Sequence, residues 1–385
     1  MSDVRAGYKR TEVGVIPEEW EALPLGSLFF IKAAGDLDKL AFGAERTDLY
    51  PHPIFANALT NAGLYGFSRS ANYAAPALTI TARGDVGKAF FRGEPFSAIG
   101  RLLVLEPIDS IDARYAASCV NELVKFSLES TGVPQLTAPQ VGRYSIPVPT
   151  VPEQQDIAQA LEDADALITA LEALIAKKRD IKQGAMQELL TGQRRLPGFL
   201  GGWTPAKVSS HSTVQVGFPF QSAFFSKEEN GVRLIRNRDL KSDEDTVFYT
   251  GDYSKDFLVE AGQLLISMDG EFTLAIWKNV TSLLNQRVAR LTPRTSDLGF
   301  MSYALAGVLG EIELATGSTT VKHLSHKDIL AIEIDTPTLD EQRAIAAVLS
   351  EMDAEIAALE KKLVKARALK QGMMQVLLTG EVRLV

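Results

Sequence analysis

Cysteine and histidine are scarce in this sequence, and their scarcity excludes several kinds of site. The single cysteine, Cys119, cannot form an internal disulfide or a cysteine-cluster zinc site. A chain with so little cysteine fits a reducing compartment. The histidines are scattered, and His323 and His326, three residues apart, have no second pair or carboxylate at a spacing that completes a metal site. The sequence therefore predicts neither a disulfide framework nor a metal centre.

The motifs of several enzyme classes are also missing. The sequence has no G-x-x-x-x-G-K-[ST] phosphate loop and no G-x-G-x-x-G cofactor loop. It also has no Asn- or Asp-Pro-Pro-aromatic stretch of the kind that amino-methyltransferases carry. We therefore expect that the chain is not itself an enzyme and binds no cofactor. The net charge is −8, so any binding of nucleic acid would need a local basic surface.

Targeting and membrane segments are absent by the usual criteria. The polar start, MSDVRAGYKRTEVG, is unlike a signal peptide. No apolar run approaches the ~18 residues that a membrane span needs. We expect a cytoplasmic chain without membrane contact.

A long internal repeat divides the chain. When the sequence is shifted by 188 positions, residues 149–196 align with 337–384 without a gap, and 26 of 48 positions are identical, against about three by chance. A weaker similarity aligns Tyr115 with Tyr303. The predicted organisation has two divergent front domains and two similar tails. Their order is front domain 1–149, tail 150–196, front domain 197–336 and tail 337–385.

Each tail has the spacing of a helix seam. Apolar residues recur at intervals of 4-3-4-3-4, the period of a coiled coil. Gly192 and Gly380 follow where a helix C-cap glycine belongs. A helix over 152–190 would be about 58 Å long, longer than a front domain is wide, so the two tails are predicted to pair as an antiparallel coiled-coil spacer. The seam residues are Ile157, Leu161, Ile168, Leu171 and Ile175 in the first tail and Ile345, Leu349, Met352, Ile356, Leu359 and Leu363 in the second.

The front domains have apolar stretches bounded by Gly and Pro, a pattern typical of strands. These stretches are Pro76–Gly84, Phe96–Pro107, Gly262–Gly270 and Asn285–Pro293. Helices are expected after them, near Asp112–Ser130 and Ser302–Ala315. The predicted fold class is α/β (mixed α+β), with two β-rich front domains, two long helices and a pseudo-twofold internal repeat.

Polar side chains at the turns of the front domains are candidates for contact with DNA. Arg pairs with guanine edges and Asn or Gln with adenine edges, and Lys and Arg also bind phosphates. The candidate residues are Asn57, Asn61, Tyr65, Arg83, Lys88 and Arg101 in the first front domain and Arg236, Asn237, Arg238, Asn285, Gln286 and Arg287 in the second.

The whole pattern resembles a known family. The tails begin PTVPEQQDI and PTLDEQRAI and end KQGAMQELLTG and KQGMMQVLLTG. The front domains contain YKRTEVGVIPEEWEALPLGSL, GFPFQSAFFSKEENGVRLIRNRDL and GQLLISMDGEF. Over nearly its full length the chain is similar to the specificity subunit of type I restriction-modification systems.

The resemblance implies a specific role for each part. Each front domain would be a target recognition domain that reads one half of a split, asymmetric DNA sequence, and the paired helices would set the unread gap. Two modification subunits would dock on the helices, carrying S-adenosylmethionine and transferring a methyl group to adenine N6. Two motor-nuclease subunits can join this complex. The specificity subunit itself has no catalytic activity.

Three alternatives stay open from the sequence. A free-standing DNA-binding regulator with a pseudo-dimeric spacer would bind DNA tightly by itself. A pseudo-symmetric enzyme would need a matching polar set in both front domains. The recognition subunit of a restriction system with fused activities would lack catalytic segments in the same way.

Overall fold

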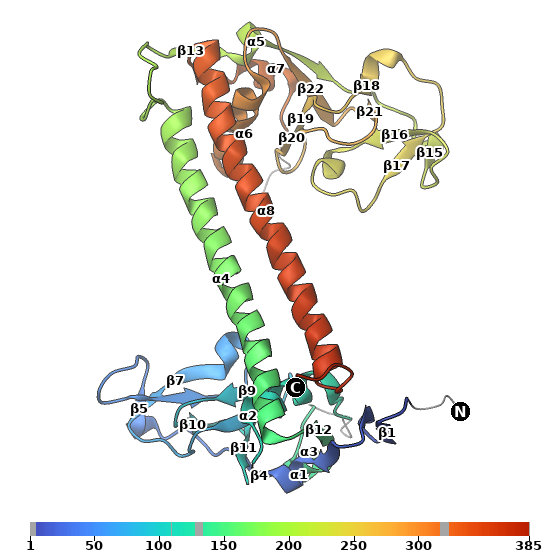
Figure 1. Cartoon of the computed structure of the whole chain (residues 1–385). Coiled ribbons are helices and arrows are strands. Elements are labelled where there is room, and N and C mark those ends of the chain that lie inside the picture. Colours follow the sequence, from blue (N-terminus) through green and yellow to red (C-terminus); the bar gives the residue numbers. More distant parts are fainter. Residues whose placement is uncertain (1–4, 109, 128–133, 316–322, 385) are drawn as a thin grey trace. The chain divides into compact units, whose positions relative to one another are not determined.

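The computed structural model describes residues 5–108, 110–127, 134–315 and 323–384. The chain divides into two compact units (Figure 1). Unit 1 comprises Met1–Glu172 and Lys361–Val385, and unit 2 comprises Ala173–Glu360. Each unit therefore combines one front domain with parts of both tails. The four segment boundaries predicted from the sequence stay predictions, because the compact units follow a different division.

The front domain of unit 1 is built from short strands and three short α-helices. Its strands are β1 (Tyr8–Thr11), β2 (Gly14–Pro17), β3 (Glu21–Pro24), β4 (Phe29–Ala33), β5 (Phe42–Gly43), β6 (His52–Phe55), β7 (Leu64–Ser68), β8 (Ala77–Ile80), β9 (Ala89–Arg92), β10 (Ser97–Ala98), β11 (Leu103–Pro107) and β12 (Ser145–Val148). Its helices are α1 (Leu25–Leu28), η1 (Lys39–Ala41), η2 (Thr60–Gly63), α2 (Ala113–Leu123) and α3 (Ala138–Gly142). The side chain of Asp112 accepts hydrogen bonds from the first backbone amides of α2 and caps that helix.

The front domain of unit 2 has the same kind of composition. Its strands are β13 (Thr204–Lys207), β14 (Ser212–Val216), β15 (Phe225–Ser226), β16 (Val232–Ile235), β17 (Val247–Tyr249), β18 (Leu258–Val259), β19 (Leu264–Ser267), β20 (Leu274–Ile276), β21 (Ser282–Leu284), β22 (Val288–Pro293) and β23 (Glu333–Thr336). Its helices are α5 (Val208–His211), η3 (Ser222–Phe224), η4 (Asn237–Leu240), η5 (Lys255–Phe257), α6 (Leu298–Ala315) and α7 (His326–Ala331). The four strands predicted from the sequence correspond to β8, β10 with β11, β19 and β22.

The two front domains share one sheet topology. The strand order β4-β11-β8-β9 in unit 1 matches β14-β22-β19-β20 in unit 2. In the second sheet, β10-β6-β7-β5 matches β21-β16-β17-β15, with β18 added at the edge in unit 2. In both units one pair is parallel, β10 with β6 and β21 with β16. The repeat found in the tails therefore extends through both front domains.

The central strands β8 and β19 are buried on both faces, which explains why their sequences are apolar apart from Thr79 and Ser267. In β8, Leu78 and Ile80 pack in the main core of unit 1, whereas Ala77 faces a second core under Phe96. In β19, Leu264 and Ile266 face the main core of unit 2, and the residue between them faces the other side.

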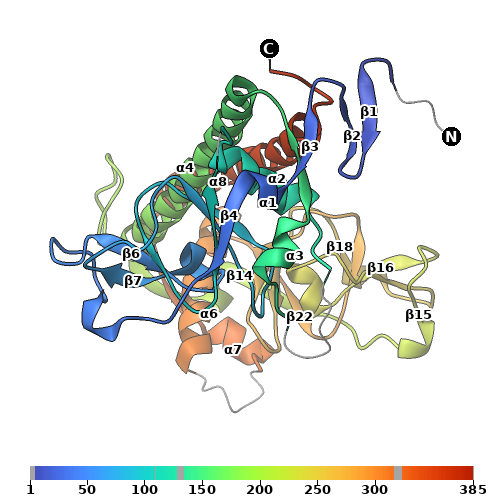
Figure 2. The ribbon, with the colours of Figure 1, turned by 90° about the horizontal axis from the view of Figure 1, so that it is seen from below.

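The tails form the long helices α4 (Val151–Leu190) and α8 (Leu339–Leu377). Both views show the helices side by side (Figure 2). Ion pairs between them show the antiparallel direction, because residue numbers rise on α4 as they fall on α8. In unit 1 the pairs are Asp165–Lys370 and Glu172–Arg367; in unit 2 they are Arg179–Glu360 and Lys182–Asp353. Gly192 and Gly380 both have φ of 70° just after the helices, as a C-cap requires.

These ion pairs repeat the shift of 188. Lys182 and Asp353 in unit 2 are the counterparts of Lys370 and Asp165 in unit 1. The pair Arg179–Glu360 corresponds in the same way to Arg367–Glu172. Much of the identity between the tails is therefore explained by contacts within this chain, since each tail supplies the partner for the other.

The predicted seam residues are all buried or half-buried, and they divide into two groups. Residues at the start of each helix pack into a front domain: Ile157 and Leu161 lie in the core of unit 1, and Ile345 and Leu349 lie in that of unit 2. The residues in the middle of the helices are Ile168, Leu171, Ile175, Met352, Ile356, Leu359 and Leu363.

A buried carboxylate fastens the start of each long helix. In unit 1, Glu153 is 2% exposed, pairs with Arg383 and accepts a hydrogen bond of 3.2 Å from the indole of Trp20. In unit 2, Glu341 is 1% exposed and pairs with Arg195 at 2.5 Å. These arginines also lie over the rings of Trp20 and Trp203. Each arginine follows the end of one long helix, so it joins that end to the start of the other helix.

Helix α6 corrects one sequence expectation. It is long and apolar enough to cross a membrane by length and composition, whereas no such stretch was expected from the sequence. Only 28% of it is buried. Its buried residues include Phe300, Met301 and Leu305, which pack into the core of unit 2. The inner face of α6 is therefore a core face, while its outer face exposes small residues and Leu314.

Candidate nucleic-acid interface

Three turns of unit 1 meet at one edge of the front domain. The side chain of Asn57, just after β6, accepts hydrogen bonds from the backbone amides of Ala82 and Arg83, just after β8. The backbone amide of Ile99, just after β10, donates to the carbonyl of Phe55 at 2.9 Å. The structure thus brings together Asn57, Arg83 and Arg101, which the sequence placed far apart.

The corresponding turns of unit 2 meet in the same way. The backbone amide of Asn285, just after β21, donates to the carbonyl of Ile235 at the end of β16. The backbone amide of Met268, just after β19, donates to the carbonyl of Arg287 at 3.0 Å. The candidates on η4 and on the β21–β22 turn therefore form one surface.

The two surfaces have topologically equivalent residues. Asn57 follows β6 at the position where Asn237 follows β16. Arg101 occupies the turn between β10 and β11, and Arg287 occupies the turn between β21 and β22. Equivalent backbone hydrogen bonds hold the two turns. The amide of Gly100 donates to the carbonyl of Gly35, and the amide of Gln286 donates to the carbonyl of Phe218, each at 3.0 Å. An arginine is thus presented at the same place in each unit.

The cations of unit 1 are free of carboxylates. Arg83, Lys88 and Arg101 are exposed, and within the described residues none of them forms an ion pair. Arg101 has φ of 63°, an uncommon value for a residue other than glycine. This edge therefore offers positive charge and guanidinium donors to a ligand without first breaking an internal pair.

Asn61 and Tyr65 lie on the hairpin between β6 and β7, and both are exposed. The backbone of this hairpin is held from below by Arg92, which is buried and donates to the carbonyl of Ala62 at 2.7 Å and to the hydroxyl of Thr79 at 2.9 Å. Burial lowers the pKa of Arg92 to about 10, so this guanidinium is still charged at neutral pH. It supports the hairpin that presents the two candidates.

The cations of unit 2 are paired. Arg236 is half-buried and donates to Asp239 at 2.8 Å and to Asp245 at 3.3 Å. Because Asp239 is buried, Arg236 has an internal role as its counter-ion. Arg238 is 68% exposed and lies 3.6 Å from Asp245. Asn237 is half-buried and accepts a hydrogen bond from the backbone amide of Arg238. Among these three candidates, Arg238 is the one that is open to a ligand.

The β21–β22 turn carries the remaining candidates of unit 2. Asn285 is half-buried, whereas Gln286 and Arg287 are exposed. Arg287 donates to Asp269 at 3.0 Å, and Asp269 also bonds the ring of His323 at 2.6 Å. Exposed ion pairs are worth little in water, so Arg287 can exchange this carboxylate for a phosphate or a base.

Sequence reasoning missed the groups that hold these turns. Arg92 and Asp269 have no distinctive sequence signal, because their role depends on neighbours more than 25 residues away. Phe218 lies at the same edge, is partly exposed, and its carbonyl accepts from Gln286. Its GFPF context was noted only as part of the family resemblance.

The two tyrosines that the repeat aligns, Tyr115 and Tyr303, have partners inside their own units. The hydroxyl of Tyr115 donates to the carbonyl of Pro147 at 3.0 Å, and burial raises the pKa of this tyrosine well above its ordinary value. The hydroxyl of Tyr303 donates to Asp353 at 2.7 Å, and its pKa is raised by burial and by that carboxylate. The described residues contain no group of three or more His, Cys, Asp or Glu side chains that could hold a metal ion.

Comparison with known families identifies the domains. The model of the type I restriction modification DNA specificity domain matches residues 17–183 and 221–366. This chain belongs to the type I restriction-modification DNA specificity family. The two matched regions correspond to the two halves of the internal repeat.

Named relatives of this chain agree with the family assignment. A putative specificity subunit of the type I restriction enzyme MjaX from Methanocaldococcus jannaschii is 24% identical over 98% of this chain and 96% of its own length. The specificity subunit of the type I enzyme EcoBI from Escherichia coli is 32% identical over 46% of this chain, and this match spans 39% of the Escherichia coli protein.

Solved structures support the fold. The S subunit of a type I restriction-modification system from M. genitalium has a TM-score of 0.64, with 16% identity, 93% of this chain and 96% of that chain covered. A chain from a structure describing complex assembly and conformational transition of the type I restriction-modification system has a TM-score of 0.56, with 16% identity over 95% of this chain and 99% of that chain.

Proposed function

We propose that this chain is the DNA-sequence-recognition subunit of a type I restriction-modification complex and reads a bipartite, asymmetric target. The observation that carries the proposal is the repeated edge of three turns, with Arg101 in unit 1 and Arg287 in unit 2 at equivalent positions. Two similar edges with different side chains suit two different half-sites. Arginine forks and amide side chains supply the donors and acceptors that distinguish base edges in the major groove.

The chain supplies recognition, and the partner subunits supply chemistry. Two methyltransferase subunits would bind S-adenosylmethionine and transfer its methyl group to adenine, in the cytoplasm where the host DNA lies. Two motor-nuclease subunits would join them in the restriction complex. This division of roles fits a chain whose conspicuous repeated tyrosines are internal scaffold residues.

A face on each long helix is the candidate docking surface for the methyltransferase subunits. Some identical tail residues are not explained by contacts within the chain. They lie one or two turns apart on one side of each helix, and none has an ion pair in the described part of the chain. The lysines and glutamines of this set are exposed and its glycines are half-buried: Lys177, Gly184 and Gln187 on α4, and Lys365, Gly372 and Gln375 on α8. We call these residues the docking faces.

The glycines of the docking faces support this assignment. A glycine inside a helix costs about 1 kcal/mol relative to alanine. A Cβ added at Gly184 or Gly372 would meet no atom of this chain within 4 Å. The chain's own packing therefore does not require glycine at either place, whereas close approach of a partner backbone would.

Mapping of methylated adenine tests the proposal. The chain is co-expressed with the methyltransferase subunit encoded with it, and methyladenine is located across the host DNA by long-read sequencing. A split asymmetric motif with a constant unread gap is expected. A complex that binds DNA but methylates no such motif would contradict the proposal.

The free-standing regulator is distinguished by the affinity of the chain alone. A regulator binds its DNA target tightly without any partner, whereas a recognition subunit needs the methyltransferase for tight binding. Electrophoretic mobility shifts with and without the partner separate the two.

A further inference from the structure

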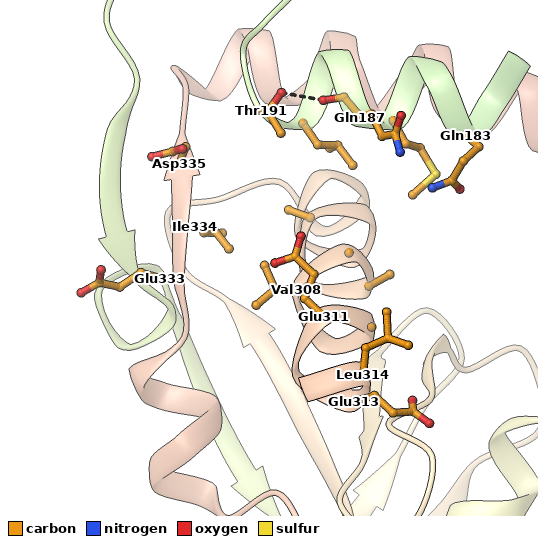
Figure 3. Close-up of a pocket in the computed structure, with 16 residues that line it drawn as sticks. Gln183, Gln187, Thr191, Val308, Glu311, Glu313, Leu314, Glu333, Ile334 and Asp335 are labelled. Carbon is orange, nitrogen blue, oxygen red and sulfur yellow. Dashed lines mark hydrogen bonds between the residues drawn. The ribbon is translucent and has the colours of Figure 1, made fainter. Parts of the chain in front are cut away.

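Unit 2 contains an open groove that the recognition of DNA does not use. It has a volume of about 870 Å³ and lies between the end of α4, helix α6 and strand β23 (Figure 3). Its apolar lining residues are Met186, Leu190, Val308, Leu314 and Ile334. Leu314 is 87% exposed. The groove is thus bordered on α6 by the exposed Leu314 and the half-buried Val308.

The border of the groove is also acidic. Glu311 lies next to Val308 on α6, and Glu333 and Asp335 flank Ile334 on β23, with their side chains on the side of the strand that faces away from the groove (Figure 3). All three carboxylates are exposed, and no Lys or Arg is among the described residues that line the groove. A surface of this charge repels DNA and attracts a cationic segment of protein.

The corresponding surface of unit 1 is covered. By the shift of 188, the counterparts of Leu190, Gly307 and Val308 are Leu378, Cys119 and Val120. Those three residues of unit 1 are fully buried, whereas their counterparts in unit 2 are half-buried or exposed.

The hairpin of β1 and β2 contacts the elements of unit 1 that correspond to the groove walls. The hydroxyl of Tyr8 donates at 2.9 Å to the carbonyl of Gly380, just after α8. The side chain of Glu12 accepts a hydrogen bond from Ser145 on β12. The tip residue Val13 packs against the core of unit 1. The hairpin therefore contacts the end of α8 and strand β12. These two elements of unit 1 correspond to the end of α4 and strand β23, which line the groove in unit 2.

The described part of unit 2 contains no such hairpin, and the charges at the equivalent positions differ. Only residues 191–203 connect α4 to β13, and they contain no strand. At the positions of Glu311, Glu333 and Asp335, unit 1 has Leu123, Ser145 and Pro147. The hairpin region of unit 1 carries Arg5, Lys9 and Arg10 against one glutamate. The groove of unit 2 has therefore gained carboxylates where the chain itself provides no cover.

The groove is continuous with a docking face. Gln187 belongs to the docking face of α4 and also lines the groove, one turn before Leu190. A partner seated on that face would reach the groove directly, which selects the methyltransferase subunit over a separate protein.

We propose that this groove receives a basic segment of the methyltransferase subunit, with an apolar side chain inserted between α4, α6 and β23, a lysine or arginine facing Glu311, and further basic side chains reaching across β23 to Glu333 and Asp335 on its outer side. This inference rests on the proposed function. It makes the two methyltransferase sites unequal, because only unit 2 leaves its groove open.

Titration of the full chain with the purified methyltransferase subunit tests the inference by calorimetry. The groove variant carries Glu311→Gln, Glu333→Gln and Asp335→Asn. The control variant carries Glu228→Gln, Glu229→Gln and Glu260→Gln, three exposed carboxylates of unit 2 that do not line the groove. We expect the groove variant to lose roughly tenfold in affinity at one of the two sites at low salt, less at high salt, and the control variant to match the unchanged chain. A second variant, Leu314→Asn, should weaken the same site at both salt concentrations.

Each other outcome overturns the inference in a recognisable way. If the unchanged chain binds no methyltransferase, the proposed function fails together with the groove. If it binds and the groove variant binds equally well at both sites, the groove assignment alone fails. If light scattering shows a dimer of the chain that the groove variant dissociates, a second copy of this chain is the occupant.

Discussion

Units 1 and 2 have the same strand order, but the arginines differ in their ion pairs at the recognition edges, the edges where the turns with the candidate DNA-contacting residues meet. In unit 1, Arg83 and Arg101 are exposed without a carboxylate partner among the described residues. In unit 2, Arg287 pairs with Asp269, and Arg238 lies 3.6 Å from Asp245. The duplicated topology fixes where a turn lies, while the side chains on it and their pairing have diverged.

The difference assigns different electrostatic roles to the two units. Unpaired cations contribute long-range attraction to a polyanion. Paired cations must exchange a carboxylate for a phosphate or a base, so they add less to attraction and more to discrimination between ligands. We therefore expect unit 1 to supply more of the salt-dependent binding and unit 2 less.

The largest expected effect concerns the buried carboxylates Glu153 and Glu341, which are equivalent in the two units but have different numbers of side-chain donors. Arg383→Met leaves Glu153 buried with only the indole of Trp20 as partner, and removal of one member of a buried pair costs about 3 kcal/mol or more. Arg195→Met should destabilise unit 2 further still, because the buried indole nitrogen of Trp203 has no hydrogen-bond partner among the described residues and so gives Glu341 no second donor. Hydrogen exchange measured by mass spectrometry, peptide by peptide in each unit, checks this order.

A double variant serves as its control. Glu153→Gln combined with Arg383→Met removes both charges of the unit 1 pair and should recover most of the lost protection. Equal losses in the two units, or no recovery, would contradict the role assigned to the Trp20 indole.

The next effect sharpens the comparison at the recognition edges. Arg101→Gln should weaken the binding of the assembled complex to its DNA target by roughly tenfold and reduce the slope of affinity against salt. Arg287→Gln should weaken binding less and change the slope less, because that arginine gives up an ion pair with Asp269 when it binds. Fluorescence anisotropy over a range of salt concentrations measures both. The reverse order would mean that unit 2 carries the electrostatic attraction.

A smaller effect is expected along the paired helices. Lys370→Asp breaks the pair with Asp165 in unit 1, and Lys182→Asp breaks the equivalent pair with Asp353 in unit 2. Each exposed or half-exposed pair contributes about 0.2–1 kcal/mol. The exchanged double variant Asp165→Lys with Lys370→Asp should restore the thermal stability that Lys370→Asp loses. Failure to do so would show that the repeated pairs are not coupled.

The smallest effect tests whether unit 1 is closed where unit 2 is open. Burial raises the pKa of the Cys119 thiol to about 12, so at pH 8 iodoacetamide should leave Cys119 unmodified in the folded chain. Gly307→Cys places a thiol at the equivalent, exposed position of unit 2, where an added Cβ meets nothing within 4 Å, and that thiol should react readily. Peptide mass spectrometry reports both sites in one sample.

The same thiol gives a pH dependence with a definite sign. Its folded pKa lies above the ordinary thiol value of about 8.5, so its protonated form is favoured by folding. The contribution of Cys119 to stability is complete below about pH 8.5 and is lost as the pH rises from there toward 12. Cys119→Ala should flatten this part of a stability curve in urea, and an unchanged curve would contradict the buried thiol.

The long helices and central strands could be predicted because their signals are local. A 4-3-4-3-4 spacing already specifies which side of a helix is covered, and the structure buries or half-buries every predicted seam residue. The buried strand Ala77–Ile80, apolar except for Thr79, was recognisable from its bounding Gly and Pro. The helix expected near Ser302–Ala315 starts earlier, at Leu298, and only with those first residues does it reach the length of a membrane span.

The candidate site was predictable as a set of turns and not as a set of contacts. Arg236 stood in the same sequence stretch as Arg238, yet the structure gives the first a buried counter-ion and leaves the second exposed. Asn57 was noted as a polar turn residue, and its side chain instead holds the backbone at Arg83. Which polar side chain is free depends on partners distant in sequence.

The sequence by itself determined that the chain is duplicated, that each tail is a long helix, and that the chain resembles the DNA specificity subunits. Repeats, helix periodicity and motifs can all be recognised from the order of residues within a continuous stretch of sequence. Only the tertiary structure showed that some residues shared by the two tails pair with each other, as in Lys182–Asp353 and Lys370–Asp165. It also decided that unit 1 is covered where unit 2 is open. These features depend on contacts between residues more than 100 positions apart, which one-dimensional patterns do not encode.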